Sequence, residues 1–301
     1  MMVHKWMWIV ILGFFYSICV ACNQNTEDGQ HTNDNNLNNI NNLNNINNNQ
    51  KNNGNNVNNY NIWIPAPETT WQWQLSDYPV DTSVDVAVYD VDLFDVSDTT
   101  FSTLRADGRR VVCYFSAGSY EDWRDDAHAF DVVDIGKPLD DWPGEYWLNV
   151  RSTQVRAIMA ARLDKAVARG CDAVEPDNVN GYLNDSGFDL TESDQIDYNR
   201  WLATEAHARG LSVGLKNCPE IAGLLEPDFD FALTEECVMY HECAFFAPFI
   251  TARKTVFHVE YVDRTTDGPA RLSDVCADPS RAHFSTLVKL WELNAWRLMC
   301  E

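Results

Sequence analysis

The sequence VRAIMAARLDKAVARGCDAVE, residues 155–175, joins a helical pattern to a short apolar strand through a glycine. Apolar residues between Ile158 and Ala166 recur at mixed three- and four-residue spacings, which is typical of one buried face of an α-helix. Gly170 suits the left-handed residue that often ends a helix, and the apolar run Ala173–Glu175 follows it. A helix, a glycine stop and a strand form one βα repeat.

The same pattern recurs along the chain. A second helical segment, Asp194–Arg209, also ends at a glycine, Gly210. Eight candidate strands are Trp71–Leu75, Val86–Tyr89, Val111–Phe115, Ala173–Glu175, Ser212–Leu215, Phe231–Leu233, Val256–Val259 and Phe284–Leu290. Eight such units predict an α/β fold, a (β/α)8 barrel of the TIM type, in which residues 62–301 form a single catalytic domain.

The segment Asp122–Val150 has no clear periodicity and is predicted to be a long loop after the third strand. It holds Trp123, Arg124, Trp142, Glu145 and Trp147 among Pro, Gly and Asp residues. Functional loops of such barrels follow the carboxyl ends of the strands. The aromatic residues are therefore expected either to line a sugar cleft or to pack the loop onto the barrel.

The amino-terminal residues predict export. Lys5 precedes an apolar run, Trp6–Ala21, that is shorter than the roughly 20 residues of a membrane-spanning helix, so residues 1–21 are predicted to be a signal peptide. The junction Ala21-Cys22 resembles a bacterial lipobox and predicts that Cys22 is lipidated. We expect a lipoprotein of the bacterial cell surface or outer membrane that touches the membrane through this anchor alone. A plain cleavage after Ala21, giving a secreted protein, is the alternative.

The segment that follows, residues 22–61, begins with the lipobox cysteine and is rich in asparagine. Asn makes up 18 of the 30 residues from His31 to Tyr60, which leaves too few apolar side chains to offset the entropy of ordering the chain. This segment is predicted to be a disordered linker.

Charge restricts the partners. The chain has 22 basic and 45 acidic residues, a formal net charge of −23 at pH 7. Such a field repels nucleic acid and anionic polymers and attracts cations, so a cationic polysaccharide is favoured and nucleic acid is not expected. The alternative is that the charge only maintains solubility. We expect a monomer.

Seven cysteines remain after Cys22, and an odd number leaves at least one thiol unpaired. Cys237 and Cys243 are close in sequence, just after the sixth candidate strand, and are predicted to form a disulfide. No CxxC pair indicates a zinc site, and the acidic run near Asp92 lacks the spacing and the central Gly of a calcium loop. We expect no metal and no cofactor.

Polar residues gather where the candidate strands finish. They are Gln74, Asp90, Asp92, Tyr114, Ser116, Glu175, Asp177, Lys216, Asn217, Glu235, Glu236 and Glu260. The carboxyl ends of parallel strands share one face of a barrel, and barrel enzymes carry out their chemistry there. These residues are therefore predicted to be a catalytic and substrate-binding group.

Six runs in this order resemble the endo-α-1,4-polygalactosaminidase family, glycoside hydrolase family 114. They are Trp71–Leu75, Tyr89–Asp95, Cys113–Ser119, Glu175–Asn178, Gly214–Asn217 and Glu235–Cys237. The resemblance covers nearly the whole domain. It implies a barrel that cuts an α-1,4-linked galactosamine polymer internally, with a retaining mechanism, no cofactor, and Asp177 and Glu235 as the catalytic carboxyl groups.

The residues alone lead to a compatible hypothesis. Glycoside hydrolysis requires two carboxyl groups that flank the scissile bond, one ionised and one protonated. Asp177 follows the fourth strand and Glu235 ends the sixth, so the two are expected to face each other across the barrel mouth, with Asp177 as nucleophile and Glu235 as acid/base. Lys216 and Asn217, on the fifth strand, are expected to hold a sugar hydroxyl. Gln74, Asp90, Asp92, Tyr114, Ser116, Glu175 and Glu260 complete the predicted substrate-binding set, and the alternative for Glu175 is a structural acid on the inner wall.

Two other functions fit the pattern. A non-catalytic surface lipoprotein could retain the cleft only to bind polysaccharide, although the presence of both acids counts against it. A glycosidase for another α-linked sugar would use the same pair. A deacetylase would need an Asp/His/His metal set, which the sequence does not offer.

Overall fold

The computed structural model describes residues 62–300. The predicted signal peptide, the predicted lipidation site Cys22 and the Asn-rich segment to residue 61 lie outside the described residues. Within residues 62–300, no helix is long and apolar enough to cross a membrane.

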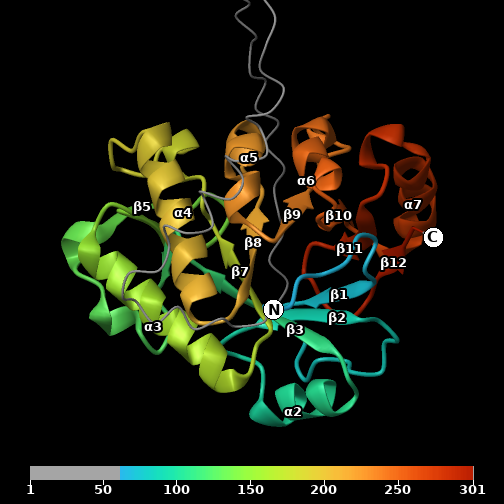
Figure 1. Ribbon diagram of the computed structural model, residues 1–301, viewed down its shortest axis with the longest axis horizontal. Helices are drawn as coiled ribbons and strands as arrows, with labels where there is room; N and C mark the ends of the chain where they lie inside the picture. Colours follow the sequence, from blue (N-terminus) through green and yellow to red (C-terminus); the bar gives the residue numbers. More distant parts are fainter. Residues whose placement is uncertain (1–61, 301) are drawn as a thin grey trace, which may run out of the picture. The chain divides into compact units, whose positions relative to one another are not determined.

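Nine strands form one curled sheet in the order β1-β2-β3-β7-β8-β9-β10-β11-β12, as Figure 1 shows. Their bounds are β1 Trp71–Gln74, β2 Val88–Asp92, β3 Arg110–Ser116, β7 Ala173–Asp177, β8 Ser212–Lys216, β9 Phe231–Glu235, β10 Val256–Val262, β11 Ser285–Leu290 and β12 Leu298–Met299. The first eight pair in parallel, and β12 pairs antiparallel with β11. All eight predicted strands are therefore present, and the (β/α)8 TIM-barrel class is confirmed.

Across residues 62–300, no ladder of hydrogen bonds joins β1 to β11. Individual hydrogen bonds join the two ends of the sheet instead. The Trp71 indole N–H donates to the Ser285 carbonyl at 2.9 Å, and the Leu75 N–H donates to the Leu293 carbonyl at 2.9 Å. The buried indole of Trp71, on β1, and the backbone of Leu75, which directly follows β1, thus help to close the barrel.

Six α-helices of the described chain lie around the outside of the curled sheet (Figure 1). They are α2 Asp98–Ala106, α3 Thr153–Arg169, α4 Glu192–Ala208, α5 Pro219–Leu225, α6 Ala247–Thr251 and α7 Gly268–Ala277. Short 3-10 turns are η1 Ala127–Ala129, η2 Val132–Asp134, η3 Gly181–Leu183, η4 Glu226–Asp228, η5 Cys243–Phe246, η6 Thr265–Asp267 and η7 Pro279–Arg281. The Ser152 hydroxyl caps the start of α3, and Gly170, at φ 77°, ends it as predicted.

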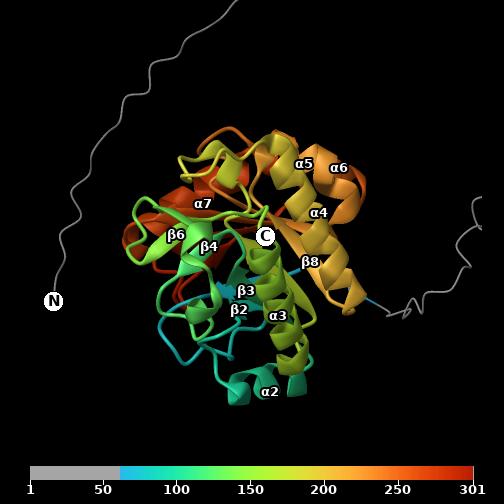
Figure 2. The ribbon, with the colours of Figure 1, turned by 90° about the vertical axis from the view of Figure 1, so that its left-hand side faces the viewer.

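The segment after β3 is not a plain loop. It contributes β4 Ser119–Glu121, β5 Ile135–Pro138 and β6 Glu145–Leu148, which form a separate antiparallel sheet in the order β4-β6-β5; β4 and β6 lie together in Figure 2. The prediction of an irregular loop over Asp122–Val150 was therefore wrong. These strands have only three or four residues and their register shifts between Ile135 and Pro138, so no alternation long enough to be recognised appears in the sequence.

Alternation along the strands separates two cores. One set of side chains faces the helices, and a second set plugs the barrel interior with Trp71, Trp73, Val88, Val112, Ala173, Phe231, Leu233 and Phe257. Fully burying one large apolar side chain stabilises the folded state by about 1.5–3 kcal/mol. These inward-facing side chains therefore form a stable apolar floor inside the barrel. Inward-facing polar residues lie nearer the carboxyl ends of the same strands, above that floor.

Candidate active site

A cleft of about 710 Å³ opens at the carboxyl ends of the strands. Its lining combines aromatic side chains from several loops with many carboxylates. Ten of the lining residues are Asp or Glu, and only two, Arg124 and Lys216, are basic. The cleft therefore carries a strong negative charge where a barrel enzyme places its chemistry.

Lys216 is the centre of the site. Its ammonium nitrogen lies 2.8 Å from Glu175 Oε1, 3.2 Å from Asp177 Oδ1 and 3.4 Å from Glu235 Oε2. Its side chain is only 3% exposed and lies over the Trp73 ring, 4.8 Å from the ring centroid. One buried cation thus joins three carboxyl groups from β7 and β9, and the two predicted catalytic acids meet through it.

Further donors fix the orientation of Asp177. The Tyr114 hydroxyl donates to Oδ2 at 3.1 Å, and the backbone N–H of Asn178 donates to Oδ1 at 2.7 Å. Both oxygens therefore have partners, while the side chain is still 19% exposed to the cleft. A carboxylate that is held from below and open above can approach a bound sugar.

Glu235 is held by its own set of partners. The Asn217 amide donates to Glu235 Oε2 at 2.9 Å, while the Asn217 carbonyl oxygen accepts from the Glu235 backbone N–H at 2.9 Å. The Tyr261 hydroxyl donates to Oε1. The side chain is 29% exposed, so it too reaches the cleft.

The backbone turns sharply after each of the three strands that carry these groups. Asn178, Asn217 and Glu236 follow the ends of β7, β8 and β9 with φ of 59°, 49° and 54°. Asn tolerates this left-handed conformation, but Glu adopts it rarely, at a cost of about 1–3 kcal/mol. Strain of this kind clusters at functional sites, and here it lies immediately after Glu235.

The shared contact with Lys216 limits the separation of the two acids. Asp177 Oδ1 and Glu235 Oε2 lie 3.2 Å and 3.4 Å from one nitrogen, so they are at most about 6.6 Å apart. Retaining glycosidases place their carboxyl groups about 5–5.5 Å apart, and inverting enzymes about 6.5–9.5 Å apart. This bound applies to the nearest oxygen of each acid, and it is compatible with the carboxyl separation of a retaining enzyme.

Strand alternation corrects two predicted substrate contacts. Gln74 and Glu260 are 0% exposed and line no part of the cleft, because their inward-facing neighbours are Trp73 and Tyr261. Gln74 donates to the carbonyls of the loop after β1. Both residues support loops near the site, and the structure does not place them among the residues that line the cleft.

Glu260 supports the loop that follows Glu235. Its Oε1 accepts from the backbone N–H of Val238 at 2.8 Å and contacts His258 Nε2 at 2.9 Å, and its Oε2 accepts from Arg271. The carboxylate therefore holds the first turn of this loop against β10.

Depth corrects three more predicted contacts. Asp90, Ser116 and Glu175 are at most 1% exposed and line no part of the cleft. They lie beneath the cleft floor, where Ser116 shares a hydrogen bond with Ser119 and Glu175 contacts Lys216. The structure therefore does not place these three predicted contacts at the cleft surface, because a strand end that is polar in sequence can still be covered by other side chains.

Four predicted contacts do line the cleft: Asp92, Tyr114, Lys216 and Asn217. Of the loop residues singled out from the sequence, Trp123, Arg124, Trp142 and Glu145 also line it, whereas Trp147 is 9% exposed and packs against Gly181. The loop aromatics therefore divide between the two expected roles.

The sequence reasoning missed several cleft residues. Tyr261, Tyr240 and Trp291 line the site, and Tyr261 stacks on Trp291 with ring centroids 4.2 Å apart. The available signal for Tyr261 was its two-residue spacing from Val259 in the seventh predicted strand. Trp291, directly after β11, lies at a strand end like the residues that were predicted.

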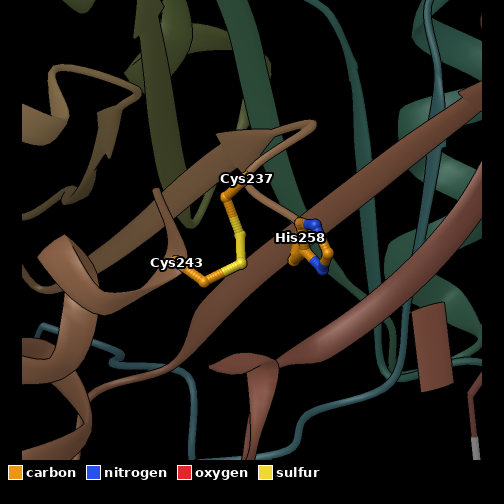
Figure 3. A group of neighbouring side chains, drawn as sticks. All are labelled: Cys237, Cys243 and His258. Atoms are coloured by element: carbon orange, nitrogen blue, oxygen red, sulfur yellow. A yellow bond between two sulfur atoms is a disulfide. The ribbon is translucent and has the colours of Figure 1, made fainter. Parts of the chain in front are cut away.

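The predicted disulfide between Cys237 and Cys243 is present (Figure 3). Two further bonds join Cys113 to Cys171 and Cys276 to Cys300, and the buried Cys218 is a free thiol, as the odd count requires. His258 lies beside the first disulfide, with potential ligand atoms all within 4.8 Å of one another (Figure 3). The two sulfurs are bonded to each other, so they are not the thiolates that a metal would need.

Comparison with known proteins gives the family. Residues 52–301 match glycoside-hydrolase family GH114. The chain belongs to this family. It is a glycoside hydrolase, and the family resemblance drawn from the six sequence runs is confirmed.

Solved structures agree with the fold. The crystal structure of Aspergillus fumigatus Ega3 in complex with galactosamine is 45% identical in sequence, covers 79% of this chain and 97% of its own, and superposes with a TM-score of 0.76. The glycoside hydrolase domain of PelA from Pseudomonas aeruginosa is 11% identical, covers 77% of this chain and 99% of its own, and has a TM-score of 0.61, which shows a shared fold. A search of curated protein sequences finds no match.

Proposed function

We propose that this GH114 enzyme hydrolyses α-1,4-linked galactosamine polysaccharide at internal bonds. The observation that carries the proposal is the pair Asp177 and Glu235, held by one buried lysine at the base of a cleft with ten carboxylates. Both basic residues of the cleft are already ion-paired. Cationic ammonium groups on a substrate would therefore find unpaired negative charge.

The similarity to Ega3 supports a galactosamine substrate. That protein was crystallised with galactosamine, and the two chains are 45% identical over most of their length. This similarity supports a galactosamine-containing substrate for the present enzyme. Exposed aromatic side chains from separate loops line the cleft, including Trp123, Trp142, Tyr240 and Trp291. Aromatic faces pack well against sugar rings, and an open cleft lets a polymer run through it, which favours endo action.

The proposed mechanism is retaining. Asp177 attacks the anomeric carbon while Glu235 donates its proton to the departing glycosidic oxygen, which forms a glycosyl-enzyme ester. Glu235 then takes a proton from water, the water oxygen bonds to the anomeric carbon, and the ester bond to Asp177 breaks. Lys216 contacts both carboxyl groups, so its positive charge balances the negative charge whether that charge lies on Asp177 or on Glu235.

Reducing ends report the activity directly. Purified protein incubated with partly deacetylated α-1,4-galactosamine polymer should release new reducing ends as oligosaccharides of mixed length. Asp177→Asn serves as the matched inactive control. Equal release by the control would contradict the assignment, and release of single sugars alone would contradict endo action.

We further propose that the enzyme is an exported monomer anchored through lipid on Cys22 at a bacterial surface. The proposal is supported by the apolar run that ends in Val20-Ala21-Cys22 and by the Asn-rich spacer after it. Cys22→Ser should release the protein from the membrane fraction in the producing cell. An unmodified amino terminus in the intact mass of the wild-type protein would contradict lipidation.

A further inference from the structure

A pair of carboxyl groups lies beneath Lys216, outside the cleft. Asp90 on β2 is 1% exposed and Glu175 on β7 is 0% exposed. Lys216 contacts Glu175 Oε1, but Glu175 Oε2 and both oxygens of Asp90 have no donor among the described residues. Three buried acceptor oxygens without a donor would be costly in a folded protein.

The two carboxyl groups are within hydrogen-bonding reach of each other. Ionised carboxylates are acceptors only, so a hydrogen bond between them requires one proton. Two adjacent buried carboxylates do not both ionise, because their charges repel and neither is solvated. A proton on one Asp90 oxygen would make that oxygen a donor to Glu175 Oε2, which satisfies two of the three oxygens.

The surroundings decide which group carries this proton. Glu175 has the Lys216 ammonium at 2.8 Å, whereas Asp90 makes no ion pair. The strand neighbours of Asp90 are Trp73 on β1 and Val112 on β3, which bring no charge.

The charged groups that act most strongly on Asp90 are Glu175 and Asp177 from β7 and Lys216 from β8. Burial, followed by the charge of Glu175, raises the pKa of Asp90 well above its usual value. Burial raises the pKa of Glu175 to about 7, and the Lys216 charge opposes that rise.

We propose that Asp90 is a positioning residue that remains a neutral carboxylic acid and donates a hydrogen bond to Glu175. This bond keeps Glu175 as the anionic partner of Lys216 and fixes the direction of its carboxylate. Lys216 is then held where its ammonium group touches both Asp177 and Glu235. Asp90 thus acts on the reaction through two other residues and never touches the sugar.

Three variants separate a neutral Asp90 from an ionised one. Asp90→Ala removes the donor and leaves the Glu175 carboxylate free to turn. We expect kcat to fall on the order of 100-fold with little change in KM, because a shift of Lys216 by about 1 Å would misplace the catalytic acids by a similar distance. Asp90→Asn supplies an amide N–H in place of the acid O–H and should recover most of that loss. Asp90→Leu fills the space without a donor and should behave like Asp90→Ala.

The pH profile gives a readout that a merely structural role would not move. If Asp90 is neutral, Asp90→Asn removes no charge, so the acid limb of kcat should stay in place. If Asp90 is ionised, Asp90→Asn removes a negative charge beside Glu175, and any limb set by Glu175 should move to lower pH. Such a shift, or an Asp90→Asn enzyme as slow as Asp90→Ala, would overturn the proposal.

Infrared spectroscopy tests the proton without any substrate. The difference spectrum of wild type minus Asp90→Asn at pH 8 should contain the carbonyl stretch of a protonated carboxylic acid. Absence of that band would overturn the proposal. The kinetic tests rest on the proposed function, but the infrared spectrum does not. If the enzyme were inactive on galactosamine polymer, the proposed function would be refuted. The presence or absence of the carbonyl band would still test whether Asp90 is protonated.

Discussion

Two buried cations stand at the mouth of the barrel, each among three carboxylates. Arg124 pairs with Asp92 at 2.7 Å, Glu121 at 2.7 Å and Asp95 at 3.1 Å. Lys216 pairs with Glu175 at 2.8 Å, Asp177 at 3.2 Å and Glu235 at 3.4 Å. Each cation meets three carboxylates, but Glu121 also pairs with a second buried cation, Arg162, at 3.5 Å, and only the Lys216 cluster has the geometry of a catalytic centre.

Exposure and hydrogen bonding separate them. The Asp92 and Glu121 side chains are 4% and 2% exposed, and Asp92 also accepts the backbone N–H groups of Phe94 and Asp95. The planar fork of Arg124 fixes these acids through several directed bonds. Around Lys216, two of the three acids reach the cleft, and an ammonium group is a point charge that allows them to move. A catalytic acid must be held in position while its oxygens are still free to contact the substrate.

The largest expected effect comes from removing the ionisable groups of the Lys216 cluster. Asp177→Asn and Glu235→Gln should each lower kcat by about 100- to 10,000-fold, because each removes a nucleophile or a proton donor from the transition state. Circular dichroism should show an unchanged fold. In Glu235→Ala, added azide should restore turnover by attacking the glycosyl-enzyme without a base. Activity close to wild type in either amide variant would remove that residue from the mechanism.

Exchanging the two cation types should affect different properties in the two clusters. Lys216→Arg should lower kcat on the order of 100-fold, because a larger, planar cation displaces the acids, while stability changes little. Arg124→Lys should lower the free energy of unfolding by about 2 kcal/mol through lost directed bonds and should slow the folded enzyme much less. Urea unfolding and kcat of the folded fraction give both values. Similar effects of the two exchanges on kcat and stability would show that the clusters have the same role.

The sequence was most informative where strands were short and buried. Runs such as Ala173–Glu175 and Phe231–Leu233 are short, and each has a candidate catalytic acid two residues after it, Asp177 and Glu235, so the meeting of these two acids followed from parallel pairing. The same argument failed for Glu260. The strand predicted to end at Val259 continues to Val262, and one residue of alternation turns Glu260 outward and Tyr261 inward.

The burial depth of polar residues and the pairing of the short strands could not be predicted from the sequence. Nothing in the order of residues shows that Asp90 lies a layer below Asp92, since both face into the barrel from the same strand. The small sheet of β4, β5 and β6 was missed because its strands are too short to show a period. Burial of a polar group depends on which loops fold over it, and loop conformations follow from contacts that are distant in sequence.

The smallest expected effect concerns two acids at the cleft that belong to neither cation cluster. Burial, followed by interaction with Glu121 and Asp177, raises the pKa of Glu145 to about 7, against a hydrogen bond from Ser119. Burial, followed by the charge of Glu260, raises the pKa of Glu236 to about 7. Both residues line the cleft; Glu236 is partly exposed, whereas Glu145 is 7% exposed and also accepts a hydrogen bond from Ser119.

A carboxyl group with a raised pKa is neutral below that value and anionic above it. As pH rises through about 7, Glu145 and Glu236 therefore gain negative charge, and KM for a polymer with permanently charged, N-trimethylated amines should fall over this window, because the substrate's own titration is then excluded. Glu145→Gln and Glu236→Gln should flatten this dependence and raise KM at pH 8 about fivefold each, the equivalent of roughly 1 kcal/mol per partly exposed ion pair. Added salt should reduce the difference because it screens these contacts, and an N-acetylated polymer should show none of it. Glu192→Gln, on α4 outside the cleft, is the matched control. If KM of both cleft variants follows pH as wild type does, recognition of ammonium groups lies elsewhere in the cleft.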